Sequence, residues 1–176
     1  MGGDNAPDIV IGGASIARER VPNLRFLIFG DETKIVPLLT RYPILKNCCE
    51  VCHTDKTISA DEKPSQALRR GRDSSMGQSI QAVKDGKASA AVLAGNTGAQ
   101  MALAKFILRT MPGIDRPALA TLLPTSRGES VMLDLGANVE CDENNLVQFA
   151  IMGAAFARTV LGVRKPSVAI LNVGVE

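Results

Sequence analysis

The sequence predicts an α/β protein with a mostly parallel sheet and helices on both faces of that sheet. Apolar runs with a strand pattern alternate with helix-like stretches along most of the 176 residues. Glycine turns that carry Asn or Asp recur at residues 1–7, 95–99 and 134–138, and the last two follow apolar runs. Such turns suit the carboxyl ends of parallel strands, where open sheets bind ligands.

Composition indicates an ordinary soluble globular chain, expected to form a single α/β domain over residues 1–176. Hydrophobic residues make up 45% and charged residues 22%, enough for one sizeable core. A net charge of +2 and 3% aromatic residues argue against nucleic-acid binding. No apolar run reaches about 18 residues, and no signal-peptide pattern opens the chain. We expect a cytoplasmic protein.

The first half of the chain is expected to contain two strands, over residues 24–29 and 50–53. An amphipathic helix over residues 8–21 precedes them, and Pro7 suits its first turn. Asp31 can cap a helix that extends to Thr40, in which Pro37 implies either a late start or a kink.

The middle of the chain is expected to be mainly helical. A polar loop over residues 59–64 leads to a basic helix over 65–72, and Asp73 or Ser74 can cap a helix over 75–85. Residues 90–94 form a continuous apolar run typical of a buried strand. Residues 97–110 are apolar nearly all round, which predicts a buried helix.

Two strands over residues 118–123 and 131–135 follow with no helix between them, so they can pair locally. A helix over 143–161 stops at Gly162 and leads to a last strand over 167–172. This helix suits either the core or a subunit interface.

The run from Cys49 to His53 spells a c-type haem attachment pattern, and Cys48 is its neighbour. Haem, zinc and redox pairing are disfavoured because the chain has one histidine and Cys141 is far away in sequence. Reduced thiols in a short strand are the preferred interpretation. His53 is expected to end that strand rather than act as a general base.

The motifs do not fit a common nucleotide site. No G-x-G-x-x-G follows a strand, and no G-K-[S/T] occurs. Instead, five segments in one order resemble the bacterial phosphate acyltransferase (PlsX) family: residues 1–7, 63–76, 94–99, 116–120 and 134–138.

This resemblance implies an acyltransferase of membrane phospholipid synthesis that moves a fatty acyl group from acyl carrier protein to inorganic phosphate. It also implies a homodimer, and a fold similar to isopropylmalate dehydrogenases and phosphotransacetylases. Family members have a strand before the first motif and a second half after residue 176, so the chain is expected to be a fragment. We expect any peripheral membrane association to come from the absent half.

The reaction needs positioning and electrostatic stabilisation, and in principle no metal or organic cofactor. Backbone N–H groups of the glycine turns suit phosphate, while Asn and Thr side chains can donate to phosphate or to the thioester oxyanion. The candidate catalytic residues are Asp4, Asn5, Asp134 and Asn138. The candidate substrate-binding residues are Gly2, Gly3, Arg72, Ser74, Ser75, Asn96, Thr97, Gly98 and Gly136.

Asp4 and Asp134 can orient a basic residue or a loop, or take the proton of monohydrogen phosphate. An equally weighted alternative is a structural role, as a helix cap or Asx turn. Arg72 is the preferred anion contact, and Arg116 is expected to position a loop. Lys63, Arg69 and Arg70 can reach phosphate, meet the acidic carrier protein, or form a solvated face.

Two other functions stay open. An oxidoreductase of the isopropylmalate dehydrogenase type would share the fold but needs a nicotinamide and clustered acids for a divalent metal. A truncated, non-enzymatic scaffold is the second alternative.

Overall fold

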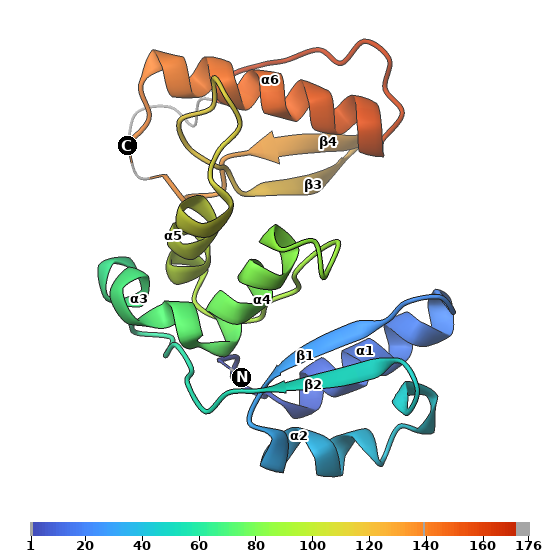
Figure 1. Ribbon diagram of the computed structural model, residues 1–176. Helices are drawn as coiled ribbons and strands as arrows, with labels where there is room; N and C mark the ends of the chain where they lie inside the picture. Colours follow the sequence, from blue (N-terminus) through green and yellow to red (C-terminus); the bar gives the residue numbers. More distant parts are fainter. Residues whose placement is uncertain (1, 139, 172–176) are drawn as a thin grey trace. The chain divides into compact units, whose positions relative to one another are not determined.

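The computed structural model describes residues 2–138 and 140–171. The chain divides into two compact units, Met1–Arg109 and Thr110–Glu176, and each is described by itself (Figure 1). Parallel strands and surrounding helices confirm the expected α/β class. That residues 1–176 make up a single domain stays a prediction.

The first unit opens with a small parallel sheet. Its strands are β1 (Phe26–Gly30) and β2 (Cys49–His53), with Phe26 opposite Cys49 and Gly30 opposite His53. The helices around the sheet are α1 (Asp8–Arg20), α2 (Glu32–Leu39) and the 3₁₀ turn η1 (Pro43–Leu45). Apolar side chains of these elements form one core: Ile11, Ile35, Leu38, Leu45 and Cys48.

Capping explains where α2 begins. The Asp31 carboxylate accepts a 3.0 Å hydrogen bond from the Thr33 N–H, as expected for an N-cap. Pro37 lies inside the helix, which starts directly after the cap at Glu32. The late start that Pro37 suggested is therefore not observed.

The rest of the first unit is helical, and in Figure 1 these helices gather together. It consists of α3 (Pro64–Arg70), the 3₁₀ turn η2 (Gly71–Asp73), α4 (Ser75–Lys84) and α5 (Thr97–Leu108). Ser74, one of the two expected caps, accepts a 3.2 Å hydrogen bond from the Gly77 N–H. A second core lies between these helices: Ile58, Ala67, Met76, Ile80, Ala99, Leu103 and Ile107.

The expected buried strand over residues 90–94 is wrong. Leu93 packs against the second core, but the Val92 side chain is 95% exposed. A strand needs hydrogen bonds to a neighbour, and in the described residues β1 and β2 pair only with each other. The apolar run therefore did not indicate a paired strand, and residues 90–94 carry no regular secondary structure.

The expectation that α5 is buried all round is also wrong. Ala99, Leu103 and Ile107 are buried on one side of the helix. Phe106 is 52% exposed and Leu108 is 43% exposed. Helix α5 thus carries more apolar side chains than its contacts with α3 and α4 bury.

The second unit is a hairpin with one helix packed on it (Figure 1). Strands β3 (Ala120–Thr125) and β4 (Gly128–Leu133) pair antiparallel, which confirms the local pairing expected. The helix α6 (Glu143–Val160) begins with a capping box in which Asp142 and Asn145 satisfy each other's backbone N–H groups. Gly153 lets α6 approach β4 closely, because a Cβ there would lie 3.3 Å from the Leu133 Cδ1.

The expected last strand is wrong over residues 167–171, which carry no regular secondary structure. Val168, Ile170 and Leu171 are mostly exposed, so the apolar run again lacks a paired neighbour in the described part of the chain. Asn172, the last residue of the expected strand, lies outside the described residues. Among the described helices, none is both long and apolar enough to span a bilayer.

Candidate functional site

In the first unit, two of the predicted glycine turns meet the start of α4. A Cβ on Gly3 would lie 2.3 Å from the Ala94 carbonyl oxygen, and one on Gly2 would lie 2.8 Å from the Ile58 oxygen. A Cβ on Gly95 would lie 3.1 Å from the Met76 Cε. At Gly2 and Gly3, one backbone segment therefore approaches another too closely for a side chain to fit. We call residues 2–7, 74–76 and 94–98 the turn cluster.

Asn96 fixes this cluster to the loop before α3. Its Oδ1 accepts a 2.9 Å hydrogen bond from the Ala99 N–H and so caps α5. Its Nδ2 donates to the carbonyl oxygens of Ser59, Ala60 and Glu62 at 3.2, 2.9 and 2.8 Å. The side chain expected to donate to substrate is thus engaged in positioning the backbone.

The exposed start of α5 is the part of the cluster best suited to an anion. Thr97 and Gly98 are exposed first residues of the helix, where N–H groups and the helix dipole favour negative charge. A Cβ on Gly98 would lie 3.0 Å from the Pro64 Cγ. The start of α3 therefore borders this position.

Asp4 and Asn5 lie at the exposed tip of the first turn. The turn is closed by a 3.0 Å hydrogen bond from the Ala6 N–H to the Gly3 oxygen, and α1 follows with Ile9 donating to the Asn5 oxygen at 3.1 Å. Their side chains face solvent, so both are open to a ligand. Their catalytic roles stay predictions.

Ser74 and Ser75 are buried. The Ser74 hydroxyl donates to the Gly71 oxygen while it caps α4. The Ser75 N–H donates to the Lys56 oxygen at 3.0 Å. The geometry gives both residues structural contacts, and their contact with substrate stays a prediction.

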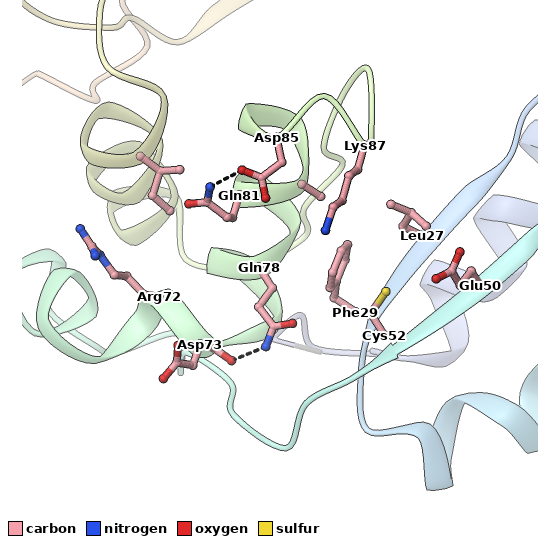
Figure 2. A pocket seen from close by; sticks show the side chains of 12 residues that line it. Leu27, Phe29, Glu50, Cys52, Arg72, Asp73, Gln78, Gln81, Asp85 and Lys87 are labelled. Atoms are coloured by element: carbon pink, nitrogen blue, oxygen red, sulfur yellow. Dashed lines mark hydrogen bonds between the residues drawn. The ribbon is translucent and has the colours of Figure 1, made fainter.

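Arg72 lines a groove of about 740 Å³ between β1, β2 and α4, shown in Figure 2. Its guanidinium carbon lies 4.6 Å from the centre of the Phe106 ring, within cation–π range. Phe106 was not predicted at this site, because an aromatic residue in an apolar helix is typical of a core position. In this groove Gln78 donates to the Asp73 oxygen at 2.9 Å.

In the second unit, Asp134 ties the third glycine turn to the hairpin. Its Oδ1 accepts from the Leu119 N–H at 2.8 Å. Its Oδ2 accepts from the N–H and the Nδ2 of Asn138 at 2.7 and 3.0 Å. Burial tends to raise the pKa of Asp134, but the hydrogen bonds from Leu119 and Asn138 outweigh it and hold the pKa below its usual value.

These contacts favour a positioning role for Asp134, and the catalytic roles of Asp134 and Asn138 stay predictions. A carboxylate that already accepts three hydrogen bonds and has a lowered pKa is a poor proton acceptor. Asn138 in turn donates to the Pro117 oxygen at 3.1 Å, and Gly136 takes a φ of 79°, which favours glycine. Of the two roles left open for Asp134, orienting a loop is the one that its contacts favour.

The third turn belongs to a different unit from the first two. Its expected meeting with them at one edge of a sheet stays a prediction.

Two minor expectations are confirmed. Arg116 donates to the Glu140 oxygen at 3.1 Å, so it joins the loop before β3 to the loop before α6. His53 ends β2, where its Nδ1 accepts from the Glu32 N–H at 3.3 Å.

All four cysteines are free. Burial, together with neighbouring Cys48, raises the pKa of Cys49 to about 12. Burial and the charge of Glu50 also raise the pKa of Cys52. A protonated thiol is a poor nucleophile and a poor metal ligand, which favours the interpretation as ordinary thiols. Within the described ranges, no three His, Cys, Asp or Glu side chains lie together as a metal site would require.

Comparison with known proteins identifies the family. The family model described as "Fatty acid synthesis protein" matches residues 1–176. The chain belongs to this family. Curated relatives named "Phosphate acyltransferase" include those of Rhodospirillum rubrum and Rhodospirillum centenum, each 61% identical over 176 residues. The relative from Parvibaculum lavamentivorans is 61% identical over 177 residues.

These alignments cover 100% of this chain but 50%, 50% and 49% of the respective relatives. The chain thus spans about half the length of the curated relatives it matches. The relatives' shared name confirms the resemblance drawn from the five sequence segments.

Proposed function

We propose that this chain is part of a phosphate acyltransferase, which forms acyl phosphate from an acyl group on acyl carrier protein and inorganic phosphate in phospholipid synthesis. The observation that carries the proposal is 61% identity, over the whole chain, to relatives named phosphate acyltransferase. The aligned region includes every residue of the turn cluster.

The chemistry of the turn cluster supports a phosphate substrate. The exposed start of α5 offers backbone N–H groups and a partial positive charge. Asn96 holds this backbone in place before any ligand arrives. Preorganised donors stabilise an anion without further ordering cost during the reaction.

In the proposed reaction, a phosphate oxygen attacks the carbonyl carbon of the thioester. A C–O bond forms, the C–S bond breaks, and the carrier thiolate leaves and takes up a proton. Thr97 and neighbouring N–H groups would hold phosphate, and an N–H donor would stabilise the oxyanion. Asp4 remains the candidate to take the phosphate proton, because its side chain is exposed and makes no hydrogen bond in the described residues.

The proposal includes a homodimer working in the cytoplasm, with acyl carrier protein and phosphate as substrates. Peripheral association with the membrane would place the enzyme near the next steps of lipid synthesis.

Acyl-phosphate formation tests the proposal directly. Acyl carrier protein thioester and inorganic phosphate would be incubated with this chain, and with a version extended to the length of its relatives. Hydroxylamine then converts acyl phosphate to a hydroxamate that can be quantified. We expect phosphate-dependent product from the extended version at least.

Thr97→Ala and Asp4→Asn variants of the active form assign the roles. T97A should raise the KM for phosphate, and D4N should lower kcat with little change in KM. No product from a folded extended chain would reject the acyltransferase. A nicotinamide-dependent fluorescence change would then favour the dehydrogenase-like alternative, and its absence the scaffold.

A further inference from the structure

Two cysteines of the first unit are neighbours in the chain and pack against the same core. Cys48 lies in the turn after η1, and Cys49 is the first residue of β2. The Cys48 side chain is buried within the first core, and the half-buried Cys49 packs against that core. Successive side chains of a regular strand point to opposite faces. The turn at Cys48 is therefore what allows both thiols to lie on one side.

The two thiol groups also act on each other. The Cys48 Sγ donates to the backbone oxygens of Ile44 and Leu45 at 3.5 and 3.6 Å, which holds its side chain in the turn. Burial and then neighbouring Cys48 raise the pKa of Cys49 to about 12, against the opposing charge of Arg18. An interaction between two thiols acts only at short range. Cys49 is thus a protonated thiol close to a second sulfur.

The other two cysteines do not join this pair. Cys52 follows Cys49 by three residues along β2, so its side chain lies on the opposite face, where it lines the groove of Figure 2 together with Glu50. Cys141 belongs to the second unit. In residues 2–138 and 140–171, no third His, Cys, Asp or Glu completes a metal site around the two thiols. The pair therefore lacks the four ligands that structural zinc requires.

We propose that Cys48 and Cys49 form a vicinal dithiol that binds monosubstituted trivalent arsenicals. Such a compound, R–As(OH)₂, keeps one bond from arsenic to carbon and replaces its two hydroxyl groups with two sulfurs, so a pair of thiols completes its coordination. Two As–S bonds form, two As–O bonds and two S–H bonds break, and two molecules of water leave. Arsenic stays trivalent, so the step needs no oxidant or reductant.

The exposure of the two side chains sets the order of this reaction. The half-buried Cys49 is the accessible thiol, whereas Cys48 is only 6% exposed. A protonated thiol attacks alkylating reagents slowly, but in condensation with As–OH its proton leaves within the water. Once arsenic is held by Cys49, the bond to Cys48 forms within one molecule, at a high effective concentration. This site lies outside the turn cluster and does not depend on acyl transfer.

Native mass spectrometry of the reduced chain with phenylarsine oxide tests the site. We expect one arsenical per folded chain, which 2,3-dimercaptopropanol removes and the monothiol 2-mercaptoethanol does not. C49A should weaken binding at least about a hundredfold, because the chelate then loses one of its two sulfurs. The control C52A/C141A removes the other two thiols and should bind within about twofold of the unaltered chain.

Equal binding by C49A and the unaltered chain would overturn the proposal, and so would loss of binding in a folded C52A/C141A. An adduct that forms only in urea would also overturn it, because the folded dithiol would then be closed to the reagent. If circular dichroism shows that C49A is unfolded, tandem mass spectrometry of the unaltered adduct decides. Arsenic on Cys48 and Cys49 supports the site, and arsenic on Cys52 or Cys141 rejects it.

Discussion

At the scale of single residues, Asp134 shows how one carboxylate can organise a loop. Its two oxygens accept from the Leu119 N–H and from two donors of Asn138. In D134N the new side-chain NH₂ group replaces one of these acceptors. It would face either the Leu119 N–H or the Asn138 donors, whichever way the amide is turned. Since hydrogen bonds to charged groups contribute about 1.5–3 kcal/mol, we expect the free energy of unfolding to fall by about 2 kcal/mol.

Urea denaturation of this chain at pH 7 measures the change. Glu129→Gln is the matched control, because it removes one negative charge from an exposed position in β4 of the same unit. We expect this control to lie within about 0.5 kcal/mol of the unaltered chain. A stability of D134N equal to that of E129Q would show that the Asp134 contacts contribute nothing.

The lowered pKa of Asp134 gives the same contribution a pH dependence. The folded pKa lies below the unfolded one, so the stabilisation is complete above the unfolded pKa of about 3.9. It is lost as the pH falls through the folded pKa. The stability difference between the unaltered chain and D134N should therefore be constant from pH 5 to 7 and shrink below about pH 4. A difference that grows on acidification would contradict this assignment.

Gly3 tests whether the turn cluster needs a bare backbone. A methyl group there would meet the Ala94 oxygen at 2.3 Å, so G3A must push two backbone segments apart. We expect a loss of about 1–3 kcal/mol and weaker protection of 94–98 amides in hydrogen exchange. Gly13→Ala is the control, since nothing lies within 4 Å of its Cβ. It should gain about 0.5–1 kcal/mol because it lies within α1.

The residue types of the candidate site were predictable from sequence, but their roles were not. Asp, Asn and Ser in a glycine turn can contact a ligand or cap a helix with the same atoms. For Asn96, Ser75 and Asp134, partners lie on other segments: Ser59, Lys56 and Leu119 among them. No local pattern shows such partners.

At the scale of elements, Asn96 joins α5 to the loop before α3. If capping were its sole role, N96D would be neutral, because Asp and Asn cap equally well. The Nδ2 contacts predict otherwise: N96D loses three donations and places a carboxylate beside three carbonyl oxygens. We expect both N96D and N96A to lower the free energy of unfolding by about 2 kcal/mol.

Asp142→Asn makes the reverse exchange at the N-cap of α6, where the cap accepts from the Asn145 N–H at 2.8 Å. It should change stability by less than about 0.5 kcal/mol. Thermal melts of the three variants decide the matter. A neutral N96D would reduce Asn96 to a simple cap.

Helices and the hairpin followed from the sequence because their signals are local. Caps at Asp31 and Ser74 and the closely spaced β3 and β4 were all predicted within a few residues. The runs over residues 90–94 and 167–171 were wrongly predicted as strands, because a strand forms only where a neighbouring strand accepts its hydrogen bonds. Their apolar composition shows only that these segments suit burial.

At the scale of the whole molecule, those two runs leave apolar side chains in solvent. Val92 is 95% exposed, and Ile170 is 77% exposed. Unpaired apolar segments promote association through free backbone and apolar contact. We expect this chain to elute above its monomer mass in size-exclusion chromatography with light scattering, and V92T/I170T to shift the distribution toward monomer. A monodisperse monomer of the unaltered chain would contradict this expectation.

The Asn96 side chain also limits how this protein can evolve. Serine offers one donor, aspartate offers none, and glutamine places its amide one methylene farther out. Each single replacement gives up either the cap on α5 or the fastening of residues 59–62. We therefore expect position 96 to tolerate few single substitutions. Asn96 binds the loop of residues 59–62 only through carbonyl oxygens of its backbone, so the side chains of that loop can change while the same amide still holds it.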